Sequence, residues 1–184
     1  MNFCGNCGHK VQFGQVPGDE IHRFFCADCG TIHYQNPKVI VGAIPQWQDQ
    51  VLLCKRAIEP RYGLWTLPAG FLENNENVEA GAVRETMEEA KAEIDILRLF
   101  SVYSLPKVGQ VYMMFLADMK NPDHGSGTES LEVALFKKDK IPWDQIAFSA
   151  ISFTLEKYFD DAGQLNGEVY LGSSGKRLRG QNSS

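Results

Sequence analysis

The chain has 184 residues, a globular composition with 43% hydrophobic residues, and a formal net charge of −5 at pH 7. This length allows one mid-sized domain and a small additional module. No apolar stretch approaches the length of a membrane span, and the negative charge argues against a nucleic-acid-binding surface as the main function. Because nothing at Met1 resembles a secretory signal peptide, we expect a cytoplasmic protein with neither a membrane nor a nucleic-acid partner.

The N-terminal segment carries two Cys-x-x-Cys pairs, formed by Cys4 with Cys7 and by Cys26 with Cys29, and glycine follows each pair. Two such pairs are typical of a closed structural zinc site with four thiolate ligands. Disulfides are the alternative, and a reducing cytoplasm favours zinc. The expected module, residues 1–34, is too short to bury its own core, so zinc binding would supply its folding energy.

Downstream segments rich in β-branched and aromatic residues predict strands. These strands are expected at residues 39–44, 51–56, 64–67, 94–103, 110–117 and 131–136. The first two would form a hairpin around residues 46–50, and the Gly/Pro-rich stretch 118–129 would be a loop. Residues 68–70 are expected to form a turn that leads toward a helix.

Two helices complete the pattern, at residues 77–90 and 151–159, with Ser149 as the cap of the second. We expect one domain over residues 35–162. Residues 163–184 are polar and rich in glycine and serine, which predicts a partly mobile C-terminal tail.

The first predicted helix carries three carboxylates, Glu85, Glu88 and Glu89, at i, i+3 and i+4. Residues at this spacing share one helix face, and a like-charged i,i+4 pair destabilises a helix by about 0.2–0.5 kcal/mol. The helix macrodipole also disfavours anions near the C-terminus. Such an unfavourable cluster suggests a bound divalent cation with oxygen ligands; a solvated acidic face is the alternative.

Apolar residues recur on the opposite side of this helix, and we expect them to anchor it in the core. They are Ala80, Val83, Met87 and Ala90. The acidic face would then point outward or into a cleft.

Residues 70–92 resemble the Nudix box, a pattern written G-x5-E-x7-R-E-U-x-E-E-x-G-U, with U an aliphatic residue. The matching positions are Gly70, Glu76, Arg84, Glu85, Glu88 and Glu89. The chain departs from the pattern at Thr86, which replaces an aliphatic residue, and at Lys91, which replaces glycine. Because glycine suits a left-handed cap best, the helix could end differently or continue past Lys91.

This resemblance implies an α/β/α sandwich with a mixed sheet and a metal-dependent pyrophosphohydrolase. Divalent cations, Mg²⁺ or Mn²⁺, would neutralise the substrate phosphates and lower the pKa of bound water. The implied ligands are Glu85, Glu88, Glu89 and the backbone carbonyl of Ala69. Arg84 would orient Glu85, and Glu76 would brace the loop before the helix.

Nudix enzymes often take a further metal ligand or base from the junction that here holds Glu129 and Glu132. We expect Glu132 in this role, since it begins a predicted strand and would be held more rigidly than a loop residue. Solvated carboxylates are the alternative at both positions.

The zinc-ribbon pattern followed by HYQNPKVIVG resembles the NADH pyrophosphatase branch of the family. That branch carries an SQPWPFPxS-type motif after the box, and this chain reads YSLPKVGQVYMMF there instead. This stretch, with LLCKRAIEPRYGLWTLPAGFLE and ESLEVALF, is more similar to zinc-ribbon Nudix proteins related to FAD pyrophosphohydrolases. The resemblance implies hydrolysis of FAD, ADP-ribose or NADH-like nucleoside diphosphate derivatives, with AMP as one product.

Basic and aromatic residues near the box could contact phosphate and stack on a flat heterocycle. They are Arg56, Arg61, Tyr62, Trp65, Tyr103 and Tyr112. A core position is the alternative for each aromatic residue. Three other functions remain open: a nucleoside triphosphate sanitiser, a non-catalytic nucleotide sensor with a zinc-ribbon interaction surface, and a nucleic-acid-binding zinc protein. A homodimer is also left open.

Overall fold

The computed structural model describes residues 1–160 and 167–175, and the chain divides into two compact units, Met1–Asn36 and Pro37–Ser184. Within the described residues, no helix is long and apolar enough to cross a membrane.

The first unit is a three-stranded antiparallel sheet in the order β1-β2-β3. Its strands are β1 (Gln12–Gly14), β2 (Arg23–Phe25) and β3 (Ile32–His33). Only three of its described hydrophobic residues are buried, Cys4, Val16 and Cys26. Since two of these are cysteines of the predicted metal site, the unit has almost no apolar core apart from the thiol cluster.

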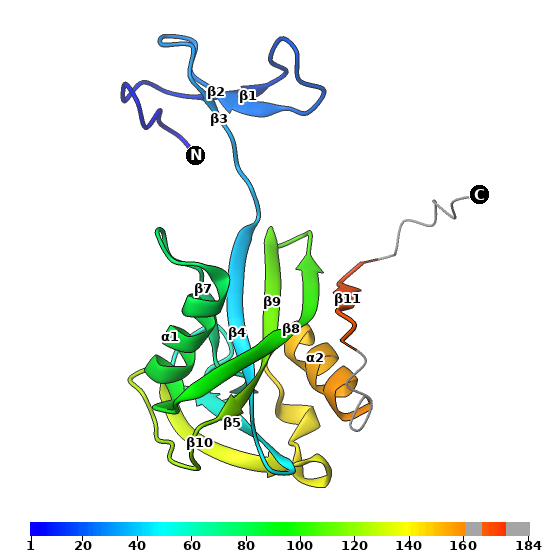
Figure 1. Cartoon of the computed structure of the whole chain (residues 1–184). Helices are drawn as coiled ribbons and strands as arrows, with labels where there is room; N and C mark the ends of the chain where they lie inside the picture. The colour runs from blue at the N-terminus through cyan, green and yellow to red at the C-terminus, as the bar shows by residue number, and fades with distance from the viewer. Residues whose placement is uncertain (161–166, 176–184) are drawn as a thin grey trace, which may run out of the picture. The chain divides into compact units, whose positions relative to one another are not determined.

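The second unit is built on a mixed eight-stranded sheet in the order β10-β5-β4-β9-β8-β11, with β6 paired to β5 and β7 to β4 (Figure 1). The pairs β4–β9 and β11–β8 are parallel, and the other pairs are antiparallel. Its strands are β4 (Lys38–Trp47), β5 (Gln50–Arg56), β6 (Trp65–Thr66), β7 (Ala69–Phe71), β8 (Ile94–Leu105), β9 (Gln110–Met119), β10 (Ser130–Lys137) and β11 (Tyr170–Ser173).

Two helices, α1 (Val78–Ala90) and α2 (Ser149–Asp160), lie on opposite faces of this sheet (Figure 1). Alternation along β4 produces the two cores, because successive side chains of a strand point to opposite faces. Ile40 and Ile44 belong to the core that includes residues of α2, whereas Val41 packs with Ala82 of α1. The expected α/β/α arrangement with a mixed sheet is therefore confirmed. Short 3₁₀ segments, Lys138–Lys140 and Trp143–Gln145, precede α2.

The predicted orientation of α1 is wrong. Ala80, Val83 and Met87 are exposed, and Ala90 is buried as expected. The buried face consists instead of small and polar residues: Gly81, Ala82, Glu85, Thr86, Glu89 and Ala90. The small side chains let the helix approach β4 closely, so Glu85 and Glu89 face the protein interior, whereas Glu88 is exposed.

Both ends of α1 have defined caps. Asn77 accepts a hydrogen bond from the Ala80 N–H at 2.7 Å. Lys91 adopts the left-handed conformation with φ 52°, and its N–H donates to the Met87 carbonyl. The helix therefore ends at the position of the missing glycine, with a lysine in the strained conformation. Thr86 is fully buried and donates to the Ala82 carbonyl at 2.8 Å.

Two short strands of the second unit were not predicted. β7 was expected to be a turn, but it pairs with β4, where a side chain at Gly42 would overlap Ala69 and the Pro68 carbonyl. β11 falls in the expected C-terminal tail and pairs with β8, where Gly172 fits against the Tyr103 ring. Residues 163–166 and 176–184 of that tail lie outside the described residues. Helix α2 begins at Ser149 itself, so the expected cap is also wrong.

Candidate active site

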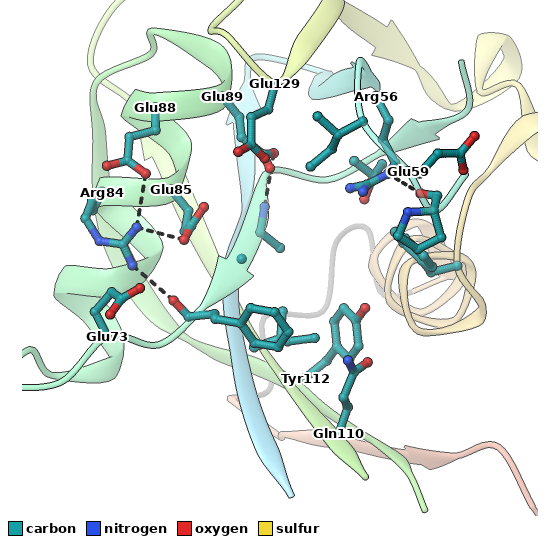
Figure 2. A pocket seen from close by; sticks show the side chains of 18 of the residues that line it. Arg56, Glu59, Glu73, Arg84, Glu85, Glu88, Glu89, Gln110, Tyr112 and Glu129 are labelled. Atoms are coloured by element: carbon teal, nitrogen blue, oxygen red, sulfur yellow. Dashed lines mark hydrogen bonds and ion pairs between the residues drawn. The ribbon is translucent and has the colours of Figure 1, made fainter. Parts of the chain in front are cut away.

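Arg84 of α1 connects the loop before the helix to the acidic face. Its Nε and Nη2 donate to the Glu76 carboxylate at 3.0 and 2.7 Å, and Nη2 also donates to the Phe71 carbonyl at 3.2 Å. Its Nη1 donates to Glu85 at 2.7 Å and to Glu88 at 3.1 Å. The hydrogen bonds from Arg84 lower the pKa of Glu76 to about 2, with help from a backbone N–H. The guanidinium thus holds the carboxylates of Glu85 and Glu88 together (Figure 2).

Glu85 and Glu89 are buried carboxylates on the inner face of α1. Burial, together with the charge of Glu85, raises the pKa of Glu89 to about 8; the Ala69 N–H, which donates to Glu89 at 3.3 Å, acts in the opposite direction. Burial also raises the pKa of Glu85, although the hydrogen bond and charge of Arg84 act in the opposite direction. Arg84 is shared among Glu76, Glu85 and Glu88, so the described residues provide Glu89 with no ion-pair partner. Buried carboxylates, one of them without a cationic partner among the described residues, are suitable ligands for a divalent cation.

Two glycines allow the backbone to approach α1 closely. A side chain at Gly70 would overlap the Glu85 carboxylate, so glycine is required where β7 passes that group. A side chain at Gly127 would overlap the Glu88 carbonyl oxygen, and the Gly127 N–H donates to the Glu89 carbonyl at 3.0 Å. This contact docks the loop before β10 onto the end of the helix and thereby positions Glu129 (Figure 2).

A cavity of about 830 Å³ lies beside this acidic face. Four of its lining residues are carboxylates that gather around the end of α1: Glu85, Glu88, Glu89 and Glu129 (Figure 2). Arg56, Tyr112 and Gln110 line another part of the cavity. The site therefore combines a cluster of carboxylate oxygens with a cationic and aromatic region, a combination that suits a phosphate-containing aromatic ligand.

Arg56 ends β5 and is held in place by its surroundings. Its Nε donates to the Pro60 carbonyl at 2.9 Å, and the guanidinium lies 5.1 Å from the centre of the Phe148 ring. Within residues 1–160 and 167–175, its two Nη groups have no hydrogen-bond partner. Arg56 thus presents unused donors and a positive charge to the cavity.

Four of the residues expected to bind substrate are not in the cavity lining. Trp65 and Tyr103 are buried in the core, where they pack against Phe136 and Phe153. The other two, Arg61 and Tyr62, lie in the loop between β5 and β6. Of the expected set, Arg56 and Tyr112 line the cavity.

The structure favours Glu129 rather than Glu132 as the additional carboxylate. Glu132 is not in the cavity lining, and its carboxylate pairs with Lys55 at 3.5 Å on the surface. The strand pairing shifts between Ser130 and Glu132, and this irregularity decides which side chains of β10 face inward. Glu129 precedes the shift, and its charge contributes to the raised pKa of Glu89, after burial and Glu85.

Phe71, Gln110 and Phe148 are among the lining residues that were not predicted from the sequence. Gln110 lies two residues before Tyr112 in a predicted strand, so the strand period of two residues could have placed both side chains on the same face. Phe71 directly follows the first glycine of the box. Phe148 gives no comparable sequence signal.

In the first unit, the Sγ atoms of the four predicted cysteines lie within 4.8 Å of one another. Cys4 and Cys29 are 3.6 Å apart, and Cys7 and Cys26 are 3.5 Å apart. A tetrahedral zinc with bonds of about 2.3 Å requires sulfur separations of about 3.8 Å. All four thiols are free, so the cluster fits zinc rather than disulfides.

The turns around these cysteines have the expected geometry. Gly8 and Gly30 have φ of 78° and 73°, and their N–H groups donate to the carbonyls of Cys4 and Cys26. Hydrogen bonds from the hydroxyl and N–H of Thr31 lower the pKa of Cys29 to about 5, which favours the thiolate that binds metal.

Comparison with protein families matches both units. The NUDIX domain model matches residues 36–152, and the Nudix N-terminal zinc-ribbon model matches residues 2–35.

Several curated proteins are similar in sequence. The NAD-capped RNA hydrolase NudC of Edwardsiella ictaluri is 32% identical over 142 residues, which cover 76% of this chain and 53% of that protein. The ADP-ribose pyrophosphatase of Methanocaldococcus jannaschii is 31% identical over 113 residues, which cover 59% of this chain and 67% of that protein. The chain thus spans about half the length of the NudC proteins that it matches.

Among solved structures, a NUDIX hydrolase from Nitrosomonas europaea is 51% identical, with a TM-score of 0.88 over 95% of this chain and 99% of that chain. An ADP-ribose pyrophosphatase from Streptococcus suis has a TM-score of 0.61 over 76% of this chain and 100% of that chain. At 18% identity, this second likeness concerns the fold alone.

Proposed function

This chain belongs to the Nudix hydrolase family, and from that membership we propose that it hydrolyses the pyrophosphate bond of nucleoside diphosphate derivatives and releases AMP. FAD and ADP-ribose are the leading substrates. The observation that carries the proposal is the cluster of buried carboxylates, Glu85 and Glu89, in a cavity that also presents Arg56 and Tyr112.

The carboxylates of Glu85, Glu88 and Glu89, with the backbone carbonyl of Ala69, would hold the divalent cations. When bound, Mg²⁺ or Mn²⁺ supplies charge neutralisation at the phosphates and a lowered pKa for coordinated water. Arg84 positions Glu85 and Glu88 by direct hydrogen bonds.

Other side chains act on the substrate and the water. Arg56 directs its free donors to a phosphate oxygen, where a guanidinium forms charge-assisted hydrogen bonds. Glu129 is placed to accept the proton of the attacking water or to provide a further cation ligand. The Tyr112 ring provides an apolar surface for the flat part of the substrate.

The zinc cluster has a separate, structural role in this proposal. Its four cysteines would fill all four positions of a tetrahedral zinc, which leaves no open position for a reacting water. The catalytic cations therefore belong to the second unit alone.

One alternative substrate has support of its own. The likeness to proteins named NAD-capped RNA hydrolase makes an NAD-capped RNA the second candidate. Against NADH itself stands the missing SQPWPFPxS-type motif. A non-catalytic nucleotide sensor would not need the complete set of carboxylates, so we consider this function less well supported than the enzyme.

A substrate panel tests the proposal. FAD, ADP-ribose, NADH, an NAD-capped RNA and the common nucleoside triphosphates are incubated with Mg²⁺ or Mn²⁺, and the products are separated by chromatography. We expect AMP from FAD or ADP-ribose at the highest kcat/KM. Pyrophosphate released from a triphosphate, with the dinucleotides untouched, would assign the protein to the sanitising enzymes instead.

A further inference from the structure

Three strands of the sheet place residues side by side on the floor of the cavity. Ile40 of β4 is in register with Phe71 of β7 on one side and with Tyr112 of β9 on the other. All three line the cavity. They form a continuous apolar and aromatic row across the floor, on which a flat heterocycle can stack.

The next row in the same direction contains Gln110. Gln110 is in register with Lys38 of β4 and with Leu105 of β8, two residues along each strand from the first row. It therefore points to the same face as Tyr112, and Figure 2 shows the two side chains next to each other. Its amide has no hydrogen-bond partner among the described residues, although it lines the cavity.

The rows are ordered with respect to the acidic cluster. Ala69, whose N–H donates to Glu89, is in register with Gly42, which lies two residues after Ile40 along β4 and on the same face of the sheet. Successive rows are about 7 Å apart, since each strand residue advances about 3.4 Å. With increasing distance from the acidic cluster, the rows are therefore those of Ala69, Tyr112 and Gln110. This order corresponds to the phosphate, the base and the edge of the base in a bound nucleotide.

We propose that Gln110 is a specificity-determining residue that recognises the adenine base of the substrate. The inference rests on the proposed function and deepens it, because adenosine monophosphate is the half that FAD, ADP-ribose and NADH share. The amide carbonyl accepts a hydrogen bond from the adenine 6-amino group, and the amide N–H donates to the adjacent ring nitrogen. Glutamine and adenine are complementary in this bidentate arrangement.

Binding of AMP isolates this recognition from hydrolysis, because AMP contains no pyrophosphate bond. Isothermal titration calorimetry with Mg²⁺ compares AMP with purine riboside 5′-monophosphate, which lacks the 6-amino group. We expect the wild type to prefer AMP about five- to tenfold, as the loss of one paired hydrogen bond predicts. In Gln110→Leu, the two ligands should bind equally, at the affinity that the wild type shows for the analogue.

Gln12→Leu is the matched control, since it makes the same chemical change at an exposed residue of β1 in the other unit. It should retain the full preference for AMP. Gln110→Ala is a second variant if leucine lowers the Tm, and it should also abolish the preference.

Equal binding of both ligands to the wild type, or no AMP binding, would overturn the role of Gln110. So would a preference for AMP that persists in Gln110→Leu and Gln110→Ala. These outcomes leave the hydrolysis of FAD or ADP-ribose untouched. Conversely, a preference lost on substitution would support Gln110 even if neither substrate were cleaved.

Discussion

At the scale of single residues, Glu89 is the clearest sign that the site is built for a cation. Its pKa lies at about 8 rather than the ordinary 4.5, chiefly because the carboxylate is buried. Without a cation, the folded protein therefore holds a proton on Glu89 at neutral pH. A bound cation would replace that proton, so cation binding and pH are coupled at this residue.

The stability of the cation-free protein should consequently fall as pH rises. Between pH 4.5 and about 8 the folded state binds the proton on Glu89 and the unfolded state does not. In this window, Glu89 lowers the free energy of unfolding by up to about 1.4 kcal/mol per pH unit. Thermal unfolding of wild type and Glu89→Gln, without added divalent cation, measures the effect. The variant should lose this slope, and an identical slope in both proteins would contradict the assignment.

The two late carboxylates give a second prediction at this scale. Glu129→Gln should lower kcat by at least about tenfold, because the residue lies among the cavity carboxylates. Glu132→Gln is its matched control and should retain wild-type activity, since its exposed ion pair with Lys55 contributes at most about 1 kcal/mol of stability. Steady-state kinetics with ADP-ribose would show the reverse order if Glu132 were the functional residue.

At the scale of elements, the C-terminal end of α1 carries a backbone strain that a glycine at position 91 would relieve. Lys91 is left-handed with φ 52°, a conformation in which glycine has no steric penalty. Lys91→Gly should therefore raise the free energy of unfolding by about 0.5–1 kcal/mol. Denaturant unfolding measures this, with Lys120→Gly of the exposed loop as a control that should gain nothing. A destabilised Lys91→Gly would show that the lysine side chain stabilises the site by other contacts.

The sequence predicted where α1 lies, but not which face it buries. Its boundaries follow from the Asn77 cap and from the spacing of the box. Its orientation does not, because the apolar stripe of Val83 and Met87 is outcompeted by the close approach of Gly81 and Ala82 to the sheet. A ligand-binding carboxylate breaks the rule that charged faces point to water.

Short strands were the other features that the sequence could not predict. β7 and β11 contain too few residues for a period of two to be visible, and each forms only because a longer strand offers its edge. Long-range pairing, with the shift in β10, also leaves Glu129 in the cavity lining and Glu132 outside it, which the sequence could not predict. In contrast, the four cysteines could be assigned to one cluster from spacing alone.

At the scale of the whole molecule, the two units differ in what stabilises them. The second unit has extensive hydrophobic cores on both faces of its sheet. The first has two cysteines and Val16 as its buried hydrophobic residues in the described structure. We therefore expect metal binding to supply most of the folding free energy of the first unit.

We expect one zinc ion per chain, measurable by elemental analysis of protein purified without chelator. Cys26→Ser should lose the zinc and unfold residues 1–36, while the second unit retains its secondary structure. Cys54→Ser is the control, because Cys54 lies in the other unit and outside the cluster. Absence of zinc from the wild type would contradict the prediction.

If the carboxylates of α1 carry out cation-dependent hydrolysis, AMP release from ADP-ribose or FAD should depend on both the cation and Glu89. AMP formation is measured with and without Mg²⁺ for the wild type, Glu89→Gln and Glu132→Gln. We predict that omission of the cation or substitution of Glu89 lowers the rate by at least about 100-fold, whereas Glu132→Gln is unaffected. AMP formation that continues without a cation, or at the wild-type rate in Glu89→Gln, would contradict the account.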